Sequence, residues 1–291
     1  MTYVLLSFNH ARFVRQAIES ILAQDYPAIE LIVVDDGSTD GSVELLRALS
    51  AERGFRLLEK SNGGVVSALN AGAPLAAGEF IVPHASDDIS HPGRTRAQVA
   101  LLRENPEVGF TAGGIRKIDE GGEMLVAQPA PGLRRYGFAD FRAGRASVPA
   151  VSCMYRAEAI KPVLPLDETI AFEDVQLYWR VTEQGWTCLY DGRMALVDYR
   201  ILRNSLGRGG KVRLWRDFMR FIQRYRDQPW YVDLRARANS GMFVQLAVSE
   251  KAEAVRFFLG NAGEITLKAA LRGWLALVMP RWLQEKLRRK Y

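Results

Sequence analysis

The sequence predicts an α/β protein with a mostly parallel sheet flanked by helices and a helical C-terminal extension. About 110 N-terminal residues alternate short β-branched runs with amphipathic helical patterns. The segment from 109 to 155 changes to short strands and turns, and the last third is mainly helical. Alternation of strands and helices is typical of a parallel sheet covered by helices on both faces.

The N-terminal part is expected to contain strands and helices in strict alternation. The apolar runs predict strands at 2–8, 29–36, 55–60 and 79–84, and patterns of helical period predict helices at 12–25, 42–52, 65–76 and 93–105. Ligands of such sheets bind beyond the carboxyl ends of the strands. The loops that follow these strands are therefore where function is expected.

Later segments indicate how the chain is divided. Residues 119–123 predict a hairpin tip, 128–132 a break, and 172–185 a helix that ends at Gly185. The segment NSLGRGG at 204–210 is the best candidate linker. The predicted domains are a larger one at 1–204, with halves of about 1–110 and 111–204, and a helical region at 205–291.

Composition excludes several classes of protein. The chain has 291 residues, of which 48% are hydrophobic and 25% charged, as in ordinary globular proteins. Cys153 and Cys188 are too few for a disulfide scaffold or a zinc site, which favours a reducing compartment. We see neither a signal peptide nor a run of roughly 18 apolar residues. We expect a cytoplasmic protein, with the inner face of the plasma membrane as the alternative.

Charge is distributed unevenly along the chain. The formal net charge is +6, and basic residues concentrate in the last third, at 213–228 and 283–291, whereas the acidic clusters lie in the first two thirds. A basic protein can meet nucleic acid, anionic lipid or an anionic small substrate. This asymmetry indicates chemistry in the first part and attachment in the second, and we expect no nucleic-acid partner.

All of the loops after the predicted strands are polar, and two of them are acidic. They contain Ser7-Phe8-Asn9, then Asp35-Asp36-Gly37-Ser38-Thr39-Asp40, then Ser61-Asn62-Gly63-Gly64, and finally Ala85-Ser86-Asp87-Asp88. In the second loop Asp35 and Asp36 have two interpretations. They could cap a strand-to-helix turn, or accept hydrogen bonds from a ribose hydroxyl or a base N–H. Because adjacent carboxylates exceed what one cap needs, a nucleotide is the favoured ligand.

Asp87 and Asp88 also allow two interpretations. A solvated acidic loop ahead of a helix that starts near Pro92 would be mildly stabilised by the helix dipole. The alternative is a site for Mg²⁺ or Mn²⁺, which binds one or two protein carboxylates and completes its shell with water and substrate phosphates. A diphosphate on the metal would explain the paired acids, since a Lewis acid neutralises the charge of such a leaving group.

Glu173 and Asp174 form a third acidic pair, at the start of the predicted helix. Acids are common at helix N-termini, where the dipole favours them. Together with a sugar nucleotide, however, this pair would supply a general base, because a sugar hydroxyl needs a carboxylate to accept its proton as it attacks an anomeric carbon. The isolated histidines, His10, His84 and His91, receive no catalytic role.

Four blocks of the sequence, in order, resemble the inverting family 2 glycosyltransferases of GT-A fold, over about residues 2 to 205. They are SFNHARFVRQAIESILAQDYPAIELIVVDDGSTDGS, NGGVVSALNAG, SDD followed by HPGRTRAQVALLRENPEVGF, and LPLDETIAFEDVQLYWRVTEQGW. The resemblance implies a nucleotide-sugar half at about 1–110, an acceptor half at about 111–204, and transfer by a single displacement. It implies a UDP- or dTDP-linked donor and a glycan or lipid-linked acceptor in polysaccharide assembly.

The resemblance also implies roles for individual residues. Nucleotide-sugar binding falls to Ser7, Asn9, Asp35, Asp36, Asn62, Gly63, Ser86 and Asp87; metal binding to Asp88 and Asp87; and catalysis to Asp174 as base with Glu173 beside it. This sequence departs from the family at Ala85, where an aspartate is common, and at Leu202, where many members carry a histidine. Both departures predict weaker metal binding, and Arg200, Arg203 or Arg208 could then meet the diphosphate charge.

Two other functions and one attachment mode stay open from the sequence. A catalytically silent nucleotide-sugar-binding module would explain Ala85 and Leu202, and a sugar nucleotidyltransferase would share the sheet but usually needs a glycine-rich first loop, which SFNHARF lacks. Near the C-terminus Leu267, Leu271, Trp274, Leu275 and Val278 recur at helical spacing. That pattern predicts either a helix packed on the larger domain or an amphipathic helix on an anionic membrane.

Overall fold

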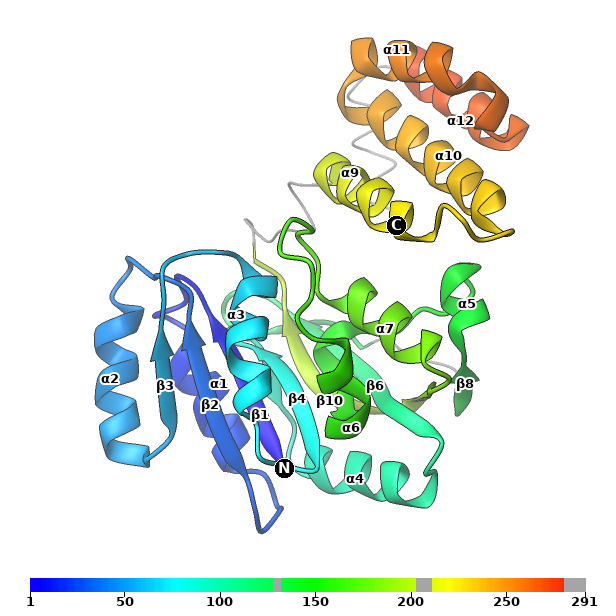
Figure 1. The fold of residues 1–291 in the computed structure, drawn as a ribbon. Helices are drawn as coiled ribbons and strands as arrows, with labels where there is room; N and C mark the ends of the chain where they lie inside the picture. Colours follow the sequence, from blue (N-terminus) through cyan, green and yellow to red (C-terminus); the bar gives the residue numbers. More distant parts are fainter. Residues whose placement is uncertain (128–131, 203–210, 280–291) are drawn as a thin grey trace. The chain divides into compact units, whose positions relative to one another are not determined.

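The computed structural model describes residues 1–127, 132–202 and 211–279, which belong to two compact units, Met1–Leu202 and Arg203–Tyr291 (Figure 1). The predicted linker at 204–210 and nearly all of the predicted break at 128–132 lie outside the described residues. The domain boundary at 204 therefore stays a prediction.

Ten strands of the described residues form one sheet in the larger unit, in the order β3-β2-β1-β4-β9-β6-β10-β5, with β7 beside β6 and β8 beside β10. The strands are β1 Thr2–Ser7, β2 Glu30–Asp35, β3 Arg56–Glu59, β4 Phe80–Ala85, β5 Ile89–Ser90, β6 Val108–Ile118, β7 Met124–Ala127, β8 Arg134–Tyr136, β9 Met154–Arg156 and β10 Thr187–Arg200. The helices are α1 Val14–Leu22, α2 Ser42–Arg53, α3 Val65–Gly72, α4 Arg94–Glu104, α5 Phe138–Arg142, α6 Ala157–Ile160 and α7 Asp174–Glu183.

The predicted parallel sheet is confirmed for the N-terminal strands, because β1 runs parallel to β2 and β4, and β2 parallel to β3. Beyond β4 the sheet becomes mixed. The strand β9 is antiparallel to both β4 and β6, whereas β6 and β10 are parallel. The sequence did not predict this continuation, since β9 is only three residues long and is surrounded by turns.

Alternation along the strands places helices on both faces. Tyr3 and Leu5 of β1 belong to the core that α1, α2 and α4 share, whereas Val4 points to the other face. There α3 approaches so closely that a Cβ on Gly72 would lie 2.6 Å from Val4 and 2.8 Å from Val34. In Figure 1, α3 lies in front of the sheet and α1 behind it.

The register of the parallel strands brings their carboxyl ends to one edge. Ser7 pairs with Asp35 across β1 and β2, and Leu6 pairs with Ala85 across β1 and β4. The polar loops singled out in the sequence therefore start side by side, as predicted.

Helix α7 is anchored by aromatic rings. Phe110 of β6 stacks on Tyr178 of α7 at 5.5 Å between ring centroids, and on Tyr155 of β9 at 4.9 Å. Gly185 follows the helix with a φ of 93°, a left-handed conformation that ends helices. The predicted helix is confirmed, and the aromatic stack fixes the position of its N-terminus.

The smaller unit contains α9 Lys211–Ile222, α10 Tyr231–Ser249, α11 Lys251–Asn261 and α12 Leu267–Val278. Its core forms around Phe243 and Leu246 of α10, which are fully buried. The predicted helical character of this region is confirmed. Across the described parts of the chain, none of the helices has the length and apolar character needed to cross a bilayer.

Candidate active site

Hydrogen bonds join the loops after β1, β2 and β4 into one surface. Asn9 adopts a left-handed conformation with a φ of 55° and accepts a hydrogen bond from the Thr39 amide at 2.8 Å, while its own amide donates to Ser38 Oγ at 2.9 Å. His10 Nδ1 lies 2.8 Å from Ser86 Oγ. Because Asn tolerates the left-handed region, Asn9 can turn back towards the second loop.

Asp35 is buried, and its carboxylate organises its own loop. One oxygen accepts from the Ser38 amide at 2.8 Å and the other from Ser38 Oγ at 2.7 Å. This is the turn-forming geometry that the sequence left open as an alternative. Nucleotide binding by Asp35 stays a prediction.

Asp36 connects the second loop to the third. Its carboxylate, also buried, accepts from Lys60 Nζ at 2.7 Å, from the Gly63 amide at 3.0 Å and from the Gly64 amide at 2.7 Å. These bonds fix the exposed loop that contains Asn62 and Gly63. Asp36 therefore positions residues of the predicted nucleotide site, whatever else it contacts.

Asp88 is buried and Asp87 is partly buried, so neither lies in a fully solvated loop. Asp88 is 1% exposed; its Oδ1 accepts from the Arg200 amide at 2.9 Å, whereas its Oδ2 has no hydrogen-bond partner among the described residues. Burial, reinforced by the charge of Asp87, raises the pKa of Asp88 well above its usual value. Burial also raises the pKa of Asp87, which lies 3.7 Å from His10 Nδ1. An unpaired buried carboxylate oxygen is costly, which makes Asp88 a candidate ligand for a bound group.

The residues at this loop fit a divalent cation. No group of three or more His, Cys, Asp or Glu side chains that could hold a metal occurs within residues 1–127, 132–202 and 211–279. Mg²⁺ and Mn²⁺ need only one or two carboxylates when substrate phosphates and water supply the other oxygens. The free oxygen of Asp88 and the adjacent Asp87 meet that requirement, since both offer hard oxygen ligands.

Arg200, at the end of β10, holds the loop that contains Asp87 and Asp88. Its Nε donates to the Asp87 carbonyl at 2.9 Å, and the remaining guanidinium nitrogens donate to the Asp119 carbonyl at 3.1 Å and to Gln16 at 2.9 Å. The guanidinium also lies 4.7 Å from the centre of the Phe13 ring. These contacts make Arg200 a positioning residue; Arg203 and Arg208 lie outside the described residues.

Glu173 and Asp174 lie at the N-terminus of α7, which follows β9 in the sequence. Asp174 Oδ1 accepts from the Val175 amide at 2.7 Å. Desolvation, with the neighbouring charge of Asp174, raises the pKa of Glu173 to about 7. Desolvation raises the pKa of Asp174 as well. The described structure shows no hydrogen bond or ion pair between this pair and Asp87 or Asp88, so a substrate would have to bridge them.

Comparison with known proteins identifies the family. The sequence model described as glycosyl transferase family 2 matches residues 2–163, which is more than half of the chain. The chain belongs to glycosyl transferase family 2. The prediction of a glycosyltransferase is thereby confirmed at the level of the family.

Two relatives of this family 2 chain are bacterial proteins. It is 31% identical over 189 residues to the putative glycosyltransferase EpsE of Bacillus subtilis, an alignment that covers 62% of this chain and 65% of EpsE. It is 21% identical over 228 residues to the poly-beta-1,6-N-acetyl-D-glucosamine synthase of Staphylococcus epidermidis, covering 77% of this chain and 54% of that protein. The chain thus spans about two thirds or less of these relatives.

The fold is similar to that of a solved protein, S. aureus TarS. The structure of S. aureus TarS residues 1–349 in complex with UDP-GlcNAc superposes with a TM-score of 0.70 and 14% identity, covering 93% of this chain and 83% of that one. A second structure of TarS 1–349 gives a TM-score of 0.69 and 13% identity, covering all of this chain and 91% of that one. The predicted GT-A fold with a helical C-terminal region is confirmed.

Three contacts at the candidate site were not predicted from the sequence. His10 and Lys60 contact predicted site residues, and Arg200, which the sequence offers only as a partner for the diphosphate, donates to the Asp87 carbonyl. These contacts join segments that are far apart in the sequence, so no local pattern marks them. A lysine two residues before Asn62 was the one available signal, because buried carboxylates need a cation.

Proposed function

We propose that this family 2 chain transfers a sugar from a nucleoside diphosphate sugar to a hydroxyl of a glycan or lipid-linked acceptor, with inversion, in cell-surface polysaccharide synthesis. The observation that carries the proposal is the unpaired, buried Oδ2 of Asp88 at an edge where the loops are already tied together. A UDP-linked donor is favoured because the similar TarS structure is a complex with UDP-GlcNAc. The similarity to the poly-beta-1,6-N-acetyl-D-glucosamine synthase supports a polysaccharide as the class of product.

The donor would lie along the carboxyl edge of β1, β2 and β4. Ser7 Oγ is buried and has no hydrogen-bond partner among the described residues, so it is available to the nucleoside. Asn62 is exposed on the loop that Asp36 fixes. The preformed loops spare the donor much of the entropic cost of ordering its site.

Asp87 and Asp88 would hold Mn²⁺ or Mg²⁺, as is common in the family. When bound there, the ion would neutralise charge that develops on the diphosphate as the glycosidic bond to it breaks. The Arg200 amide keeps one oxygen of Asp88 fixed, which leaves the other oriented for a ligand.

Asp174 would act as the general base. The acceptor oxygen forms a bond to the anomeric carbon on the face opposite the diphosphate, the bond from that carbon to the diphosphate oxygen breaks, and the hydroxyl proton passes to the Asp174 carboxylate. A raised pKa suits this task, because a more basic carboxylate takes the proton more readily. Glu173, whose pKa is about 7, would stay beside it as a second carboxyl group.

The test compares Asp174→Asn with the unchanged chain in a sugar-transfer assay and in calorimetry with UDP. Loss of the base should lower the rate of transfer by about 10²- to 10⁴-fold. UDP affinity should stay the same, because the hydrogen bond found for the Asp174 carboxylate among the described residues is to the amide of its own helix and not to a nucleotide loop. Full transfer by the variant would overturn the assignment of the base.

The same measurements separate the alternative functions. UDP binding with no transfer from any donor to any acceptor would indicate a catalytically silent binding module. Release of pyrophosphate from a nucleoside triphosphate and a sugar phosphate would indicate a nucleotidyltransferase. Either result would replace the proposal.

We also propose that α12 lies on an anionic membrane. Its apolar side chains are exposed along one stripe: Leu267 is 76% exposed, Leu271 64%, Trp274 41%, Leu275 59% and Val278 77%. Such a stripe with a tryptophan is typical of helices that bind at the lipid headgroup level. The sequence that follows is basic, with Arg281, Lys286, Arg288, Arg289 and Lys290 outside the described residues.

Sedimentation with vesicles tests the membrane contact. The double variant Leu271→Glu, Leu275→Glu should sediment less with phosphatidylglycerol vesicles than the unchanged chain, whereas Leu259→Glu, an equally exposed leucine on α11, should not. Unchanged sedimentation of the double variant would exclude α12 as the membrane contact.

A further inference from the structure

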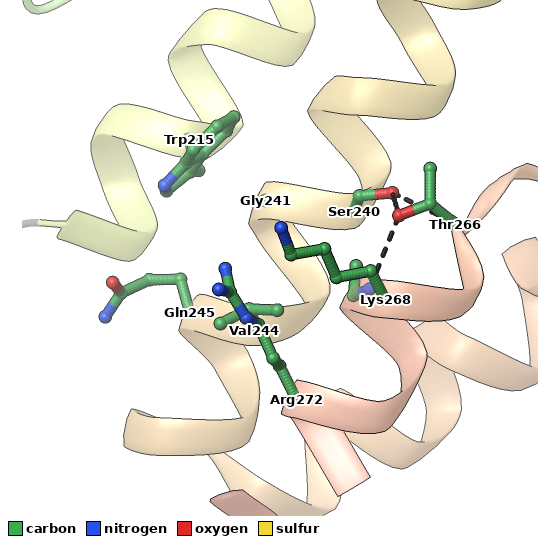
Figure 2. Close-up of a pocket in the computed structure, with 9 residues that line it drawn as sticks. Trp215, Ser240, Gly241, Val244, Gln245, Thr266, Lys268 and Arg272 are labelled. Atoms are coloured by element: carbon green, nitrogen blue, oxygen red, sulfur yellow. Dashed lines mark hydrogen bonds between the residues drawn. The ribbon is translucent and has the colours of Figure 1, made fainter.

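The helical unit contains a cavity of its own, of about 450 Å³, lined by α9, α10 and the start of α12. Figure 2 shows Trp215 from α9, Gln245 from α10, and Lys268 and Arg272 from α12 around it. No carboxylate lines the cavity. Its polar side-chain groups are therefore two cations, an amide, the indole N–H of Trp215 and the hydroxyls of Ser240 and Thr266.

The two cations of the cavity lack the partners that other arginines of this unit have. Lys268 and Arg272, one helical turn apart, form no hydrogen bond or ion pair within the described residues. In contrast, Arg216 lies 2.6 Å from Glu253, and Arg235 is paired with Glu264. Placing two unpaired cations at one opening creates a local positive potential that attracts an anion.

The aromatic wall depends on a glycine. A Cβ on Gly241 would lie 2.3 Å from the Trp215 ring, so the indole occupies space that any other residue at 241 would fill. Trp215 remains half-exposed towards the cavity. A flat, partly exposed ring beside polar groups is the kind of surface on which the apolar face of a sugar packs.

We propose that this cavity binds an anionic sugar, with the sugar ring on Trp215 and its phosphate or carboxylate on Lys268 and Arg272. Guanidinium and ammonium groups recognise such anions by charge-assisted hydrogen bonds. Gln245 supplies a donor and an acceptor for ring hydroxyls. This assignment rests on the proposed function, in which the ligand is an anionic part of the glycan or of the sugar phosphate that carries it.

Calorimetry on the full chain, without donor or metal, tests the cavity separately from sugar transfer. The probes are glucose 6-phosphate, glucuronic acid, glucose and inorganic phosphate. The first two should bind more tightly than the last two, because only they combine a ring with an anion. Arg272→Glu and Lys268→Glu should each weaken their binding about tenfold or more. Both side chains are exposed, so these variants should fold.

The test also needs a control variant and a comparison with a lipid phosphate as the source of the anion. Arg256→Glu, an exposed arginine on α11 that does not line the cavity, should bind glucose 6-phosphate like the unchanged chain. Failure of both anionic sugars to bind at millimolar concentration, or equal binding by all variants, would overturn the proposal. Equal affinity for inorganic phosphate would remove the role of Trp215. If Arg272→Glu reduces only sedimentation with phosphatidylglycerol vesicles, the cavity binds a lipid phosphate instead and the sugar assignment is wrong.

Discussion

Replacing Glu173 by Gln should make the folded chain more stable at neutral pH. In the folded state the pKa of Glu173 is about 7, against an ordinary value of 4.5, because the charged form is desolvated and lies beside Asp174. Between these values the folded state holds a proton that the unfolded state has released. The free energy of unfolding therefore decreases as pH rises through this window.

The magnitude follows from the difference in pKa. About 2.5 pH units at 1.36 kcal/mol each give about 3 kcal/mol lost by the unchanged chain between about pH 4.5 and pH 7. Glu173→Gln has no proton to lose there, so it should escape this loss. Above the window the variant should be more stable than the unchanged chain by up to about 3 kcal/mol, and below it the two should be similar. The raised pKa of Asp174 adds a slope of the same sign in both proteins.

Urea unfolding from about pH 4 to about pH 8 measures this difference as a change in midpoint. Glu158→Gln, which removes an exposed carboxyl group from α6, is the matched control and should follow the unchanged chain. If Glu173→Gln shows the same pH dependence as the control, the desolvation of Glu173 is wrong, and with it the environment assigned to the proposed base.

Other predictions concern the loops and the helical unit. Asp36→Ala leaves Lys60 and two backbone amides without their acceptor, so thermal unfolding should show a loss of about 3 kcal/mol together with weaker UDP binding. Asp88→Asn should abolish any increase in UDP affinity that Mn²⁺ causes, as measured by calorimetry; a preserved increase would place the metal elsewhere. Gly241→Ala should destabilise the chain by about 1 to 3 kcal/mol, since its Cβ would overlap an indole ring. Gly260→Ala, in open space within α11, should instead be neutral or stabilise by about 0.5 to 1 kcal/mol in the same melting experiment.

Local patterns predicted the parts of the fold that local physics decides. The alternation of β-branched runs with helical periods was enough for β1 to β4 and for α1 to α4, and Gly185 indicated where α7 ends. The mixed part of the sheet was not predictable in this way. Strand β9 is short, and it exists because β4 and β6 both present open edges to it. Its pairing is decided by tertiary contacts, which override the weak propensity of three residues.

At the candidate site, too, local patterns and tertiary contacts decide different features. The sequence predicts the acidic loops, but it does not indicate which carboxylates already have partners within the protein. Asp35 and Asp36 were both assigned to the nucleotide, and the structure gives both carboxylates hydrogen bonds within the protein. Lys60 and the amides that satisfy them belong to loops whose meeting depends on the register of β1, β2 and β3. That register comes from packing on both faces of the sheet, which a motif does not contain.

Hydrogen-bond satisfaction therefore separates acids that build the site from acids that await a ligand. A buried carboxylate with several N–H donors, such as that of Asp36, has its hydrogen bonds satisfied within the protein without any substrate. Asp88 is different, because burial and the charge of Asp87 both oppose its ionisation while one oxygen has no donor among the described residues. A bound cation would offset these unfavourable effects, because it would pair with the free oxygen of Asp88 and attract the charges of both carboxylates. Ala85 removes one carboxylate from this loop, so any metal there depends on Asp87, Asp88 and the oxygens that the donor itself brings.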